Sequence, residues 1–270
     1  MNNATEPSDL LVETRGLGVR FGTQQILRKL HISIPRGQTL AIIGESGCGK
    51  TVFLKTLIGL IPPSDGRVLF DGRELTKLSD IERTRQRVRF GFVFQNAALF
   101  DSLTVGQNIA FPLREHSQLE DTEVRERVDR LLLEVGLPSS IVSKKPAELS
   151  GGMRKRVGVA RALALEPEIM LYDEPTTGLD PIMSDVINEL MMRTRVGRTS
   201  VIVTHDMRTA RKVADRVIML YPLARLDPDA SQLIFDGPPS QLDHAQDRRV
   251  TQFVMGEAGE RLMELREAAS

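Results

Sequence analysis

The chain has little cysteine, no net charge and no long apolar run, and each absence excludes a class of protein or of site. Its 270 residues include a single cysteine, which excludes an internal disulfide framework and a multi-cysteine metal site. This composition fits a reducing compartment. Lys+Arg and Asp+Glu number 36 each, so the formal net charge is zero. Such a balance gives no electrostatic indication of nucleic-acid binding.

Apolar stretches such as residues 217–221 are far shorter than the roughly 18 residues that a spanning helix needs. Residues 1–9 lack the positive charge and apolar run of a secretory signal, and we expect them to form a flexible leader. The charged fraction of 27% and the hydrophobic fraction of 41% are typical of a soluble globular protein with one large core. We therefore expect a cytoplasmic protein whose membrane work is done through another subunit.

A glycine-rich loop at residues 44–51 is the strongest chemical signal. It joins an apolar strand over 39–43 to an apolar helical run over 52–60, and it spells G-x-x-x-x-G-K-[ST]. Glycines allow backbone N–H groups to turn around a phosphate, and the helix N-terminus adds positive charge. A chance glycine turn is the alternative, but the flanking strand and helix favour nucleotide binding. The residues expected to hold the nucleotide are Gly44, Glu45, Ser46, Gly47, Cys48, Gly49, Lys50, Thr51 and Val52.

Within this loop the sequence predicts distinct roles for two side chains. Lys50 would reach the β- and γ-phosphates, and the hydroxyl of Thr51 would hold Mg²⁺. An apolar strand over 169–173 ends in the carboxylates Asp173 and Glu174. Asp173 can complete the Mg²⁺ shell, and Glu174 can orient and polarise the attacking water. Acidic residues merely ending a strand are the alternative, which the upstream phosphate loop disfavours.

The order of the predicted elements indicates an α/β fold. Two β-rich stretches come first, strand–loop–helix follows over 38–60, and helices dominate from about 96 to 165. One of these helices is predicted over 122–135 by the helical spacing of Val124, Val128, Leu131, Leu132 and Val135. Strands and helices then alternate from 169 to 221. This alternation predicts a mostly parallel sheet with helices on both faces and a helical subdomain inserted in its middle. We expect one domain over 10–245, followed by a charged helical tail over 246–270.

Ser150, Gly151 and Gly152 precede a predicted helix over 153–164. Ser150 could act simply as the N-cap of that helix. Two adjacent glycines are poor for capping alone, yet they suit close backbone approach to a phosphate. We therefore expect this segment to cover a nucleotide held by a second copy of the chain.

Taken together, these motifs resemble those of the nucleotide-binding subunits of ATP-binding cassette (ABC) transporters, and the resemblance covers about residues 10–245. The family's motifs occur here in its own order: Walker A at 44–51, the Q-loop glutamine Gln95, the signature at 149–153, Walker B at 169–174, the D-loop at 178–181 and the switch His205. The resemblance implies a P-loop NTPase core with an N-terminal antiparallel β subdomain. It also implies hydrolysis of ATP with Mg²⁺, a homodimer, and an integral membrane permease as partner.

The resemblance also assigns roles to single residues. Phe21 would stack on adenine, where the family more often has tyrosine. Gln95 would contact Mg²⁺ or the attacking water and sense the permease. His205 would touch the γ-phosphate, and Asp180 would support communication between the two sites. Met153 replaces the glutamine of the usual LSGGQ signature, which removes one polar contact and keeps the serine and glycines.

A narrower resemblance, at residues 94–100, 108–116 and 153–161, is to the ATPases of Mla-type lipid transporters. It implies a cargo of phospholipid or other hydrophobic molecules and an MCE-type substrate-binding protein as partner. It also implies a peripheral location on the inner face of the cell membrane. The tail at 247–256 resembles tails that can extend toward a neighbouring subunit, and a short amphipathic helix closing the domain explains it equally well.

Other functions remain open at this stage. The chain could serve another ABC importer, for example one for amino acids. A soluble ABC ATPase acting on DNA or ribosomes usually carries two cassettes, a long coiled coil or zinc-binding cysteines, and none of these is found here. A small-molecule phosphotransferase would not explain residues 149–153. Cys48 is interpreted as a tolerated small residue. The alternative is a redox sensor with a lowered thiol pKa, which would be alkylated less when nucleotide is bound.

Overall fold

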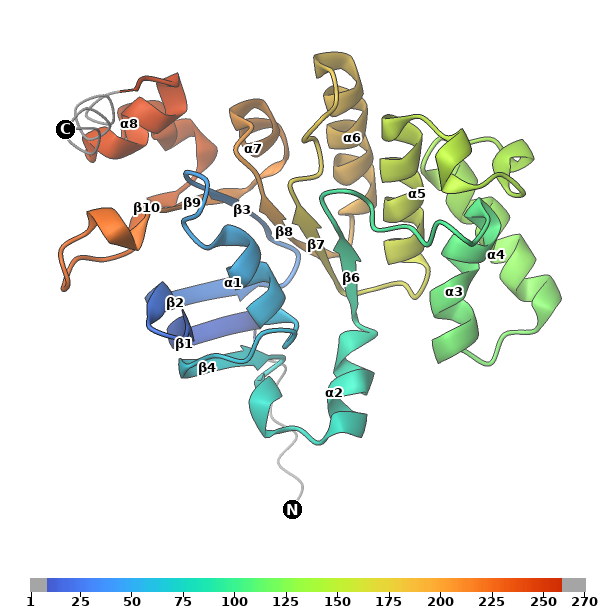
Figure 1. Ribbon diagram of the computed structural model, residues 1–270, viewed down its shortest axis with the longest axis horizontal. Helices are drawn as coiled ribbons and strands as arrows, with labels where there is room; N and C mark the ends of the chain where they lie inside the picture. The colour runs from blue at the N-terminus through green and yellow to red at the C-terminus, as the bar shows by residue number, and fades with distance from the viewer. Residues whose placement is uncertain (1–8, 259–270) are drawn as a thin grey trace.

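Two β-sheets of different kind organise the molecule in the computed structural model, which describes residues 9–258. The first sheet is antiparallel and has the strand order β2-β1-β4-β5 (Figure 1). Its hairpin turns tightly at Gly22, where φ is +58°. The strands of this sheet are β1 (Leu10–Phe21), β2 (Gln24–Pro35), β4 (Asp65–Phe70) and β5 (Arg73–Glu74).

The second sheet is parallel except at one edge, and its order is β10-β9-β3-β8-β7-β6. Its strands are β3 (Thr39–Ile43), β6 (Phe90–Val93), β7 (Ile169–Asp173), β8 (Thr199–Val203), β9 (Arg216–Leu220) and β10 (Leu233–Gly237). β3 is fully buried, and its alternate side chains face opposite sides of the sheet. Leu40 and Ile42 join the core beneath the sheet, whereas Ala41 and Ile43 pack against the C-terminal helices.

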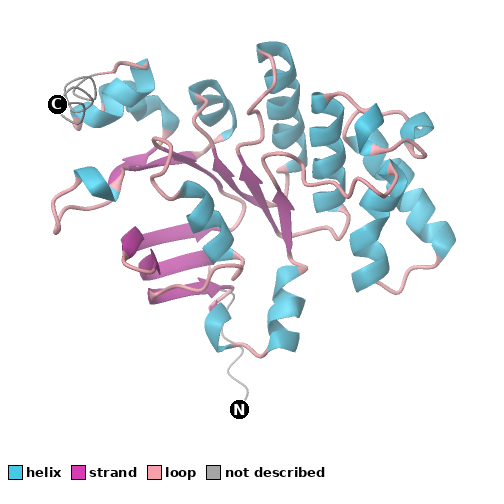
Figure 2. Ribbon diagram, in the orientation of Figure 1, coloured by secondary structure: helices cyan, strands magenta, loops and turns pink. Residues whose placement is uncertain are grey.

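Helices cover both faces of the parallel sheet (Figure 2). α1 (Lys50–Leu57) lies between the two sheets and contacts β2, β4, β7 and β8. The helical subdomain packs at the β6 side of the sheet, to the right in Figure 1, and consists of α3 (Val105–His116), α4 (Asp121–Glu134) and α5 (Gly151–Leu163). The other helices are α2 (Asp80–Arg87), α6 (Pro181–Thr194), α7 (Met207–Val213) and α8 (Arg248–Met255).

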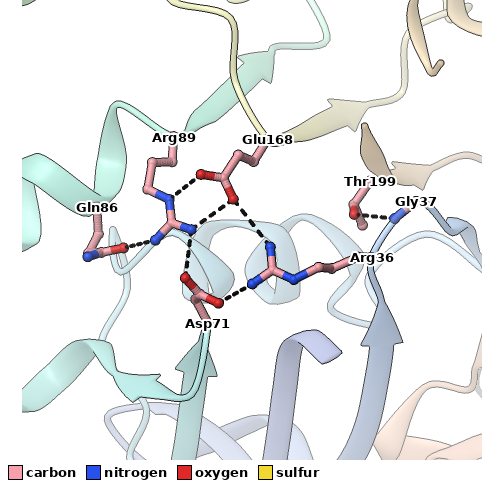
Figure 3. Close-up of polar contacts among 7 residues, drawn as sticks. All are labelled: Arg36, Gly37, Asp71, Gln86, Arg89, Glu168 and Thr199. Carbon is pink, nitrogen blue, oxygen red and sulfur yellow. Dashed lines mark hydrogen bonds and ion pairs between the residues drawn. The ribbon is translucent and has the colours of Figure 1, made fainter. Parts of the chain in front are cut away.

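An ion-pair network joins the two sheets at the end opposite the phosphate loop (Figure 3). Arg89 precedes β6 and binds Glu168, which precedes β7, at 2.7 Å. Its guanidinium also binds Asp71, which follows β4, at 2.8 Å, and lies 4.6 Å from the ring centroid of Phe70. Arg36, after β2, binds both acids from the other side. The network therefore connects the antiparallel sheet to the base of the parallel one.

The predicted fold class is confirmed: an α/β core with an N-terminal antiparallel sheet and a helical subdomain. Two details differ from expectation. α2 was not predicted, because its residues are almost all charged or polar and show no apolar period. Gly151 and Gly152 lie inside the first turn of α5 rather than before it, since Ser150 caps that turn. Residues 259–270 of the expected tail lie outside the described residues. Within the described part, no helix has the length and apolar character needed to cross a bilayer.

Candidate active site

Neighbouring parallel strands bring the predicted motifs to one edge of the sheet. The phosphate loop follows β3, Glu174 follows β7, and His205 follows β8, which lies between them. The backbone N–H of Glu174 donates to Val203 O at 2.9 Å, and the N–H of Thr204 donates to Ile42 O at 3.1 Å. The sheet ladder thus continues one residue beyond the strands. The carboxyl ends of parallel strands are where α/β proteins ordinarily bind ligands.

The phosphate loop closes around the head of its own lysine. The Nζ atom of Lys50 donates to the carbonyl oxygens of Gly44 and Glu45 at 2.7 and 2.9 Å. Gly44 has φ +142°, and a Cβ there would lie 2.2 Å from Leu220 O. Only glycine fits at this position, because both the conformation and the space exclude a side chain. The loop can therefore present its backbone to a phosphate held near Lys50.

Thr51 and Asp173 form a pair of hard oxygen donors beside this loop. The Thr51 hydroxyl donates to Asp173 Oδ1 at 2.8 Å. Burial raises the pKa of the Asp173 carboxyl, and the nearby Glu174 raises it further, while the Thr51 hydroxyl opposes both effects. Among the described residues, no group of three or more His, Cys, Asp or Glu could hold a metal by itself. One carboxylate and one hydroxyl fit Mg²⁺, which protein sites hold with few side chains together with substrate phosphates and water.

The carboxylate of Glu174 is constrained by its backbone and by its neighbours. Its φ of +50° places a non-glycine residue in the left-handed region, a strain that recurs at functional sites. The Nδ1 atom of His205 lies 2.7 Å from its Oε2, and the Thr177 hydroxyl donates to the same oxygen at 3.1 Å. Lys155 donates from Nζ to the Glu174 carbonyl at 3.4 Å. These contacts hold one carboxylate oxygen and fix the direction of the other.

A cavity of about 1030 Å³ opens over these groups. Its volume is at the upper end of ordinary small-molecule sites, which suits a nucleoside triphosphate. Gln95, Glu174 and His205 line it together with most of the phosphate loop. The C-terminal part of the chain supplies the opposite wall, from Tyr221, Arg225, Arg249, Gln252, Phe253, Gly256, Glu257 and Ala258.

The sequence analysis missed two residues that hold the phosphate loop from this C-terminal side. Gln232 is 1% exposed, and its amide nitrogen donates to the carbonyls of Cys48 and Ile26, both at 3.0 Å. Its amide oxygen accepts the N–H of Arg28 at 3.0 Å. Arg225 binds the Glu45 carboxylate at 2.8 Å. No local pattern indicates these contacts, because between 180 and 206 residues separate the partners in the chain.

Some predicted residues lie outside the cavity lining in the described part of the chain. Phe21 ends β1 and is 52% exposed. Ser150 caps α5 by accepting the N–H of Met153 at 3.3 Å, and Figure 1 shows α5 well apart from α1, with strands of the parallel sheet between them. A lid formed by Ser150, Gly151 and Gly152 therefore does not cover the phosphate loop of its own molecule.

Cys48 is buried within the loop and does not fit the redox-sensor alternative. Its side chain is 1% exposed, and burial raises the pKa of its thiol. A reactive thiol needs exposure and a lowered pKa. Cys48 instead fills space against the core that surrounds α1.

Comparison with known proteins gives a consistent result. The family model described as ABC transporter matches residues 27–177. The chain is 40% identical over 252 residues to the probable ribonucleotide transport ATP-binding protein mkl of Mycobacterium leprae, covering 93% of this chain and 70% of that protein. It is 38% identical over 250 residues to the intermembrane phospholipid transport ATP-binding protein MlaF of Haemophilus influenzae, covering 92% and 91%.

A solved structure extends the likeness to three dimensions. A dimeric ATP-binding cassette in a post-hydrolysis state with ADP and phosphate aligns with a TM-score of 0.71 and 33% identity. The alignment covers 77% of this chain and 94% of that one.

Proposed function

Because the chain belongs to the ABC transporter family and is an ATP-hydrolysing subunit of such a transporter, we propose that it powers the movement of phospholipid between membranes. The likeness to the phospholipid transport protein supports this cargo, since it runs along 91% of that relative. The relative named for ribonucleotide transport makes ribonucleotides the second candidate. That match covers a smaller share, 70%, of the relative.

We assign the hydrolytic roles to the side chains that meet at the cavity. Lys50 and the loop backbone hold the phosphates of ATP. Glu174 orients the attacking water with Oε1, the carboxylate oxygen that His205 does not contact. His205 positions Glu174 and reaches the γ-phosphate from the same cavity. Gln95 lines that cavity and would contact Mg²⁺ or the attacking water. Thr51 and Asp173 would hold Mg²⁺, which supplies neutralisation of charge on the phosphates when bound.

The site requires a second copy of the chain to be complete. We place Ser150, Gly151 and Gly152 of one copy over the nucleotide held by the other. ATP is then part of the interface, and it favours the closed dimer by its differential affinity for that form. Hydrolysis removes this preference and lets the dimer open.

An aromatic groove at the edge of β6 is the proposed seat of a permease loop. The groove has a volume of about 300 Å³, and its lining includes Phe92, Phe94, Phe100, Phe111 and Pro112. Phe100 and Phe111 are 44% and 40% exposed, with ring centroids 4.9 Å apart. Exposed aromatic rings of this kind anchor protein interfaces. A permease docked here would hold the chain at the inner face of the membrane, with an MCE-type protein as a further component.

The replacement Glu174→Gln tests the hydrolytic assignment. The amide keeps the size of the side chain and cannot act as a general base, so hydrolysis should fall by roughly a hundredfold or more while ATP still binds. A dimer should then accumulate with ATP, and light scattering detects it. The matched control is Glu189→Gln, which alters an exposed carboxylate on α6 that pairs with Lys212. Normal turnover in Glu174→Gln would refute the assignment.

The cargo is tested with the complete transporter. The chain, co-purified with its permease, is reconstituted in vesicles carrying a fluorescent phospholipid, and ATP-dependent lipid transfer is measured. Transfer that stops in Glu174→Gln supports the proposal. ATP-driven ribonucleotide accumulation without lipid transfer would favour the second candidate.

A further inference from the structure

Two consecutive residues after Gln95 are held in the left-handed backbone conformation. Ala97 has φ +61° and Ala98 has φ +46°. Neither is glycine, so each is disfavoured there by contact between its Cβ and the backbone. Such a pair persists only where the surroundings impose it. The segment that follows the Q-loop glutamine is therefore held in place from outside.

Arg161 provides that hold. This residue lies in the last turn of α5, and its guanidinium donates to Ala97 O at 2.7 Å and to Ala98 O at 2.8 Å. The planar fork of arginine suits two adjacent acceptors, whereas a lysine ammonium offers only a single point of charge. Burial lowers the pKa of the Arg161 guanidinium. The guanidinium is therefore partly shielded from water, and its hydrogen bonds to carbonyl oxygens are stronger there than in bulk solvent.

Close packing of α5 against the same turn adds a second constraint. A Cβ at Gly158, one turn before Arg161, would lie 3.2 Å from the Cβ of Ala97. Ala97 is 1% exposed, so this contact is part of the core. At the far end of the loop, the buried Asn108 accepts the N–H of Phe100 at 2.8 Å and donates to Phe100 O at 3.1 Å. The path of the loop after Gln95 is therefore fixed at both ends.

We propose that Arg161 is a positioning residue for ATP hydrolysis, which sets the place of Gln95 by gripping the carbonyls of Ala97 and Ala98. This inference rests on the role proposed above for Gln95. α5 is capped by Ser150 and runs without a break from Gly151 to Leu163, so one helix carries both the lid offered to a second copy and the arginine that binds its own Q-loop. A displacement of α5 by the partner's nucleotide would move Gln95 through Arg161.

The contact of Arg161 with the carbonyls of Ala97 and Ala98 also lies beside the aromatic groove. The guanidinium of Arg161 lies 5.8 Å from the ring centroid of Phe100, and Arg161 and Ala98 both line the groove. A permease loop seated there would contact the two partners of the grip. Arg161 therefore stands where α5, the Q-loop and the permease site meet.

Steady-state ATPase kinetics of the full chain test the inference. Arg161→Gln should lower kcat roughly tenfold and leave KM for ATP within about twofold, because Gln95 is misplaced while the phosphate loop is untouched. The kcat of Arg161→Lys should lie between those of the wild type and Arg161→Gln. The matched control is Arg156→Gln on the same helix, whose guanidinium donates to Gly136 O at 2.8 Å, away from the Q-loop. An equal loss in Arg156→Gln would overturn the inference.

The loop side provides two further variants, and one of them, Ala98→Val, does not depend on the folding of Arg161→Gln. Ala98 is exposed, so changes there leave the core intact. Ala98→Gly should restore part of the activity of Arg161→Gln, since glycine adopts positive φ without strain. Ala98→Val alone should lower kcat, because a β-branched residue resists that conformation. No rescue by Ala98→Gly together with no effect of Ala98→Val would overturn the inference.

A double-mutant comparison separates this inference from the role of Gln95 itself. If Arg161 acts through Gln95, adding Arg161→Gln to Gln95→Ala should produce no further loss of kcat. Multiplicative losses would refute the inference and leave the role of Gln95 standing. An unchanged kcat in Gln95→Ala alone would instead refute the proposed role of Gln95.

Discussion

At the scale of single residues, one strained backbone position lies beside the nucleotide cavity. Glu174 has a left-handed backbone, which costs about 1–3 kcal/mol in a residue with a side chain. The hydrogen bond from its N–H to Val203 O and the contact of Lys155 with its carbonyl hold that conformation. The position of the proposed general base therefore depends on neighbouring strands and on α5 as well as on its own rotamer.

The single cysteine gives a clean prediction at this scale. Cys48 in the native chain should react with a thiol reagent on the order of a hundredfold more slowly than in the denatured chain, since local opening must precede attack. ATP should change this rate little, because the thiol is 1% exposed with a pKa raised by burial. A time course of labelling, followed by mass spectrometry, measures both rates. Rapid native labelling that ATP suppresses would restore the redox-sensor interpretation.

The sequence could predict residues whose spacing is local. Lys50, Thr51 and the two carboxylates at the end of β7 belong to short motifs that keep one geometry wherever they occur. Thr177 and Lys155 also touch Glu174, yet they were not singled out. The contact of Lys155 arises when α5 packs at the sheet edge, and no short pattern records that packing. Thr177, by contrast, lies only three residues after Glu174, so its contact is local and could have been considered from the sequence.

At the scale of elements, the hairpin of β9 and β10 is a support for the phosphate loop. Arg28 donates from Nη2 to the carbonyls of Asp227 and Ala230, which ties the loop between these strands to β2. Gln232 then reaches from the base of β10 to the carbonyl of Cys48. The C-terminal hairpin and the N-terminal sheet thus enclose the phosphate loop from one side.

Gln232→Leu tests this support. Leucine has a similar volume but leaves the carbonyls of Cys48 and Ile26 and the N–H of Arg28 without their partner. Each buried group left unsatisfied costs about 1–3 kcal/mol, so the free energy of unfolding should fall by at least about 2 kcal/mol. KM for ATP should rise, because the loop backbone loses its support. Urea denaturation and ATPase assays measure the two effects.

An exposed glutamine provides the comparison for that variant. Gln246→Leu changes the same residue type at an exposed position and should alter neither quantity appreciably. If Gln232→Leu unfolds as wild type does and keeps its KM, the hairpin does not support the loop.

Prediction of elements from sequence depended on apolar periodicity. α4 was predicted because Val124, Val128, Leu131 and Leu132 recur at helical spacing, and all four are buried. α2 buries only Gln86 within its span, so it left no such pattern. Its helix is stabilised instead by the capping box of Ser79 and Glu82. Signals of that kind are short and easily missed without structure.

At the scale of the whole molecule, the network of Figure 3 predicts a pH dependence of stability. Arg89 is the largest cause that lowers the pKa values of both Asp71 and Glu168 from their ordinary 3.8 and 4.5. A carboxyl whose pKa is lower in the folded state stabilises the fold above its unfolded value, and this contribution is lost as pH falls through the folded value. The network should therefore weaken below about pH 4.5.

Arg89→Gln makes this measurable. We expect the variant to be less stable at pH 7 by about 1–2 kcal/mol, because it loses the ion pairs and the packing of the guanidinium on Phe70. The difference from wild type should shrink as the pH falls below 4.5. Thermal unfolding of both proteins at pH values from 3 to 7 measures this difference. The control is Arg73→Gln, which removes an exposed ion pair with Glu82. A constant difference across this range would contradict the electrostatic account.

The strand order of the parallel sheet also bears on how the protein is made. β3, which leads into the phosphate loop, lies between β8 and β9, so Leu40 cannot pair until Val201 and Arg216 have been synthesised. At 5–20 residues per second, a ribosome needs about ten to thirty seconds to add the intervening chain. During that interval an apolar strand emerges without its neighbours. Nascent chains should therefore require chaperones to bind this strand until synthesis is nearly finished. A truncated mRNA that ends before β9 should yield an aggregating product rather than a smaller active enzyme.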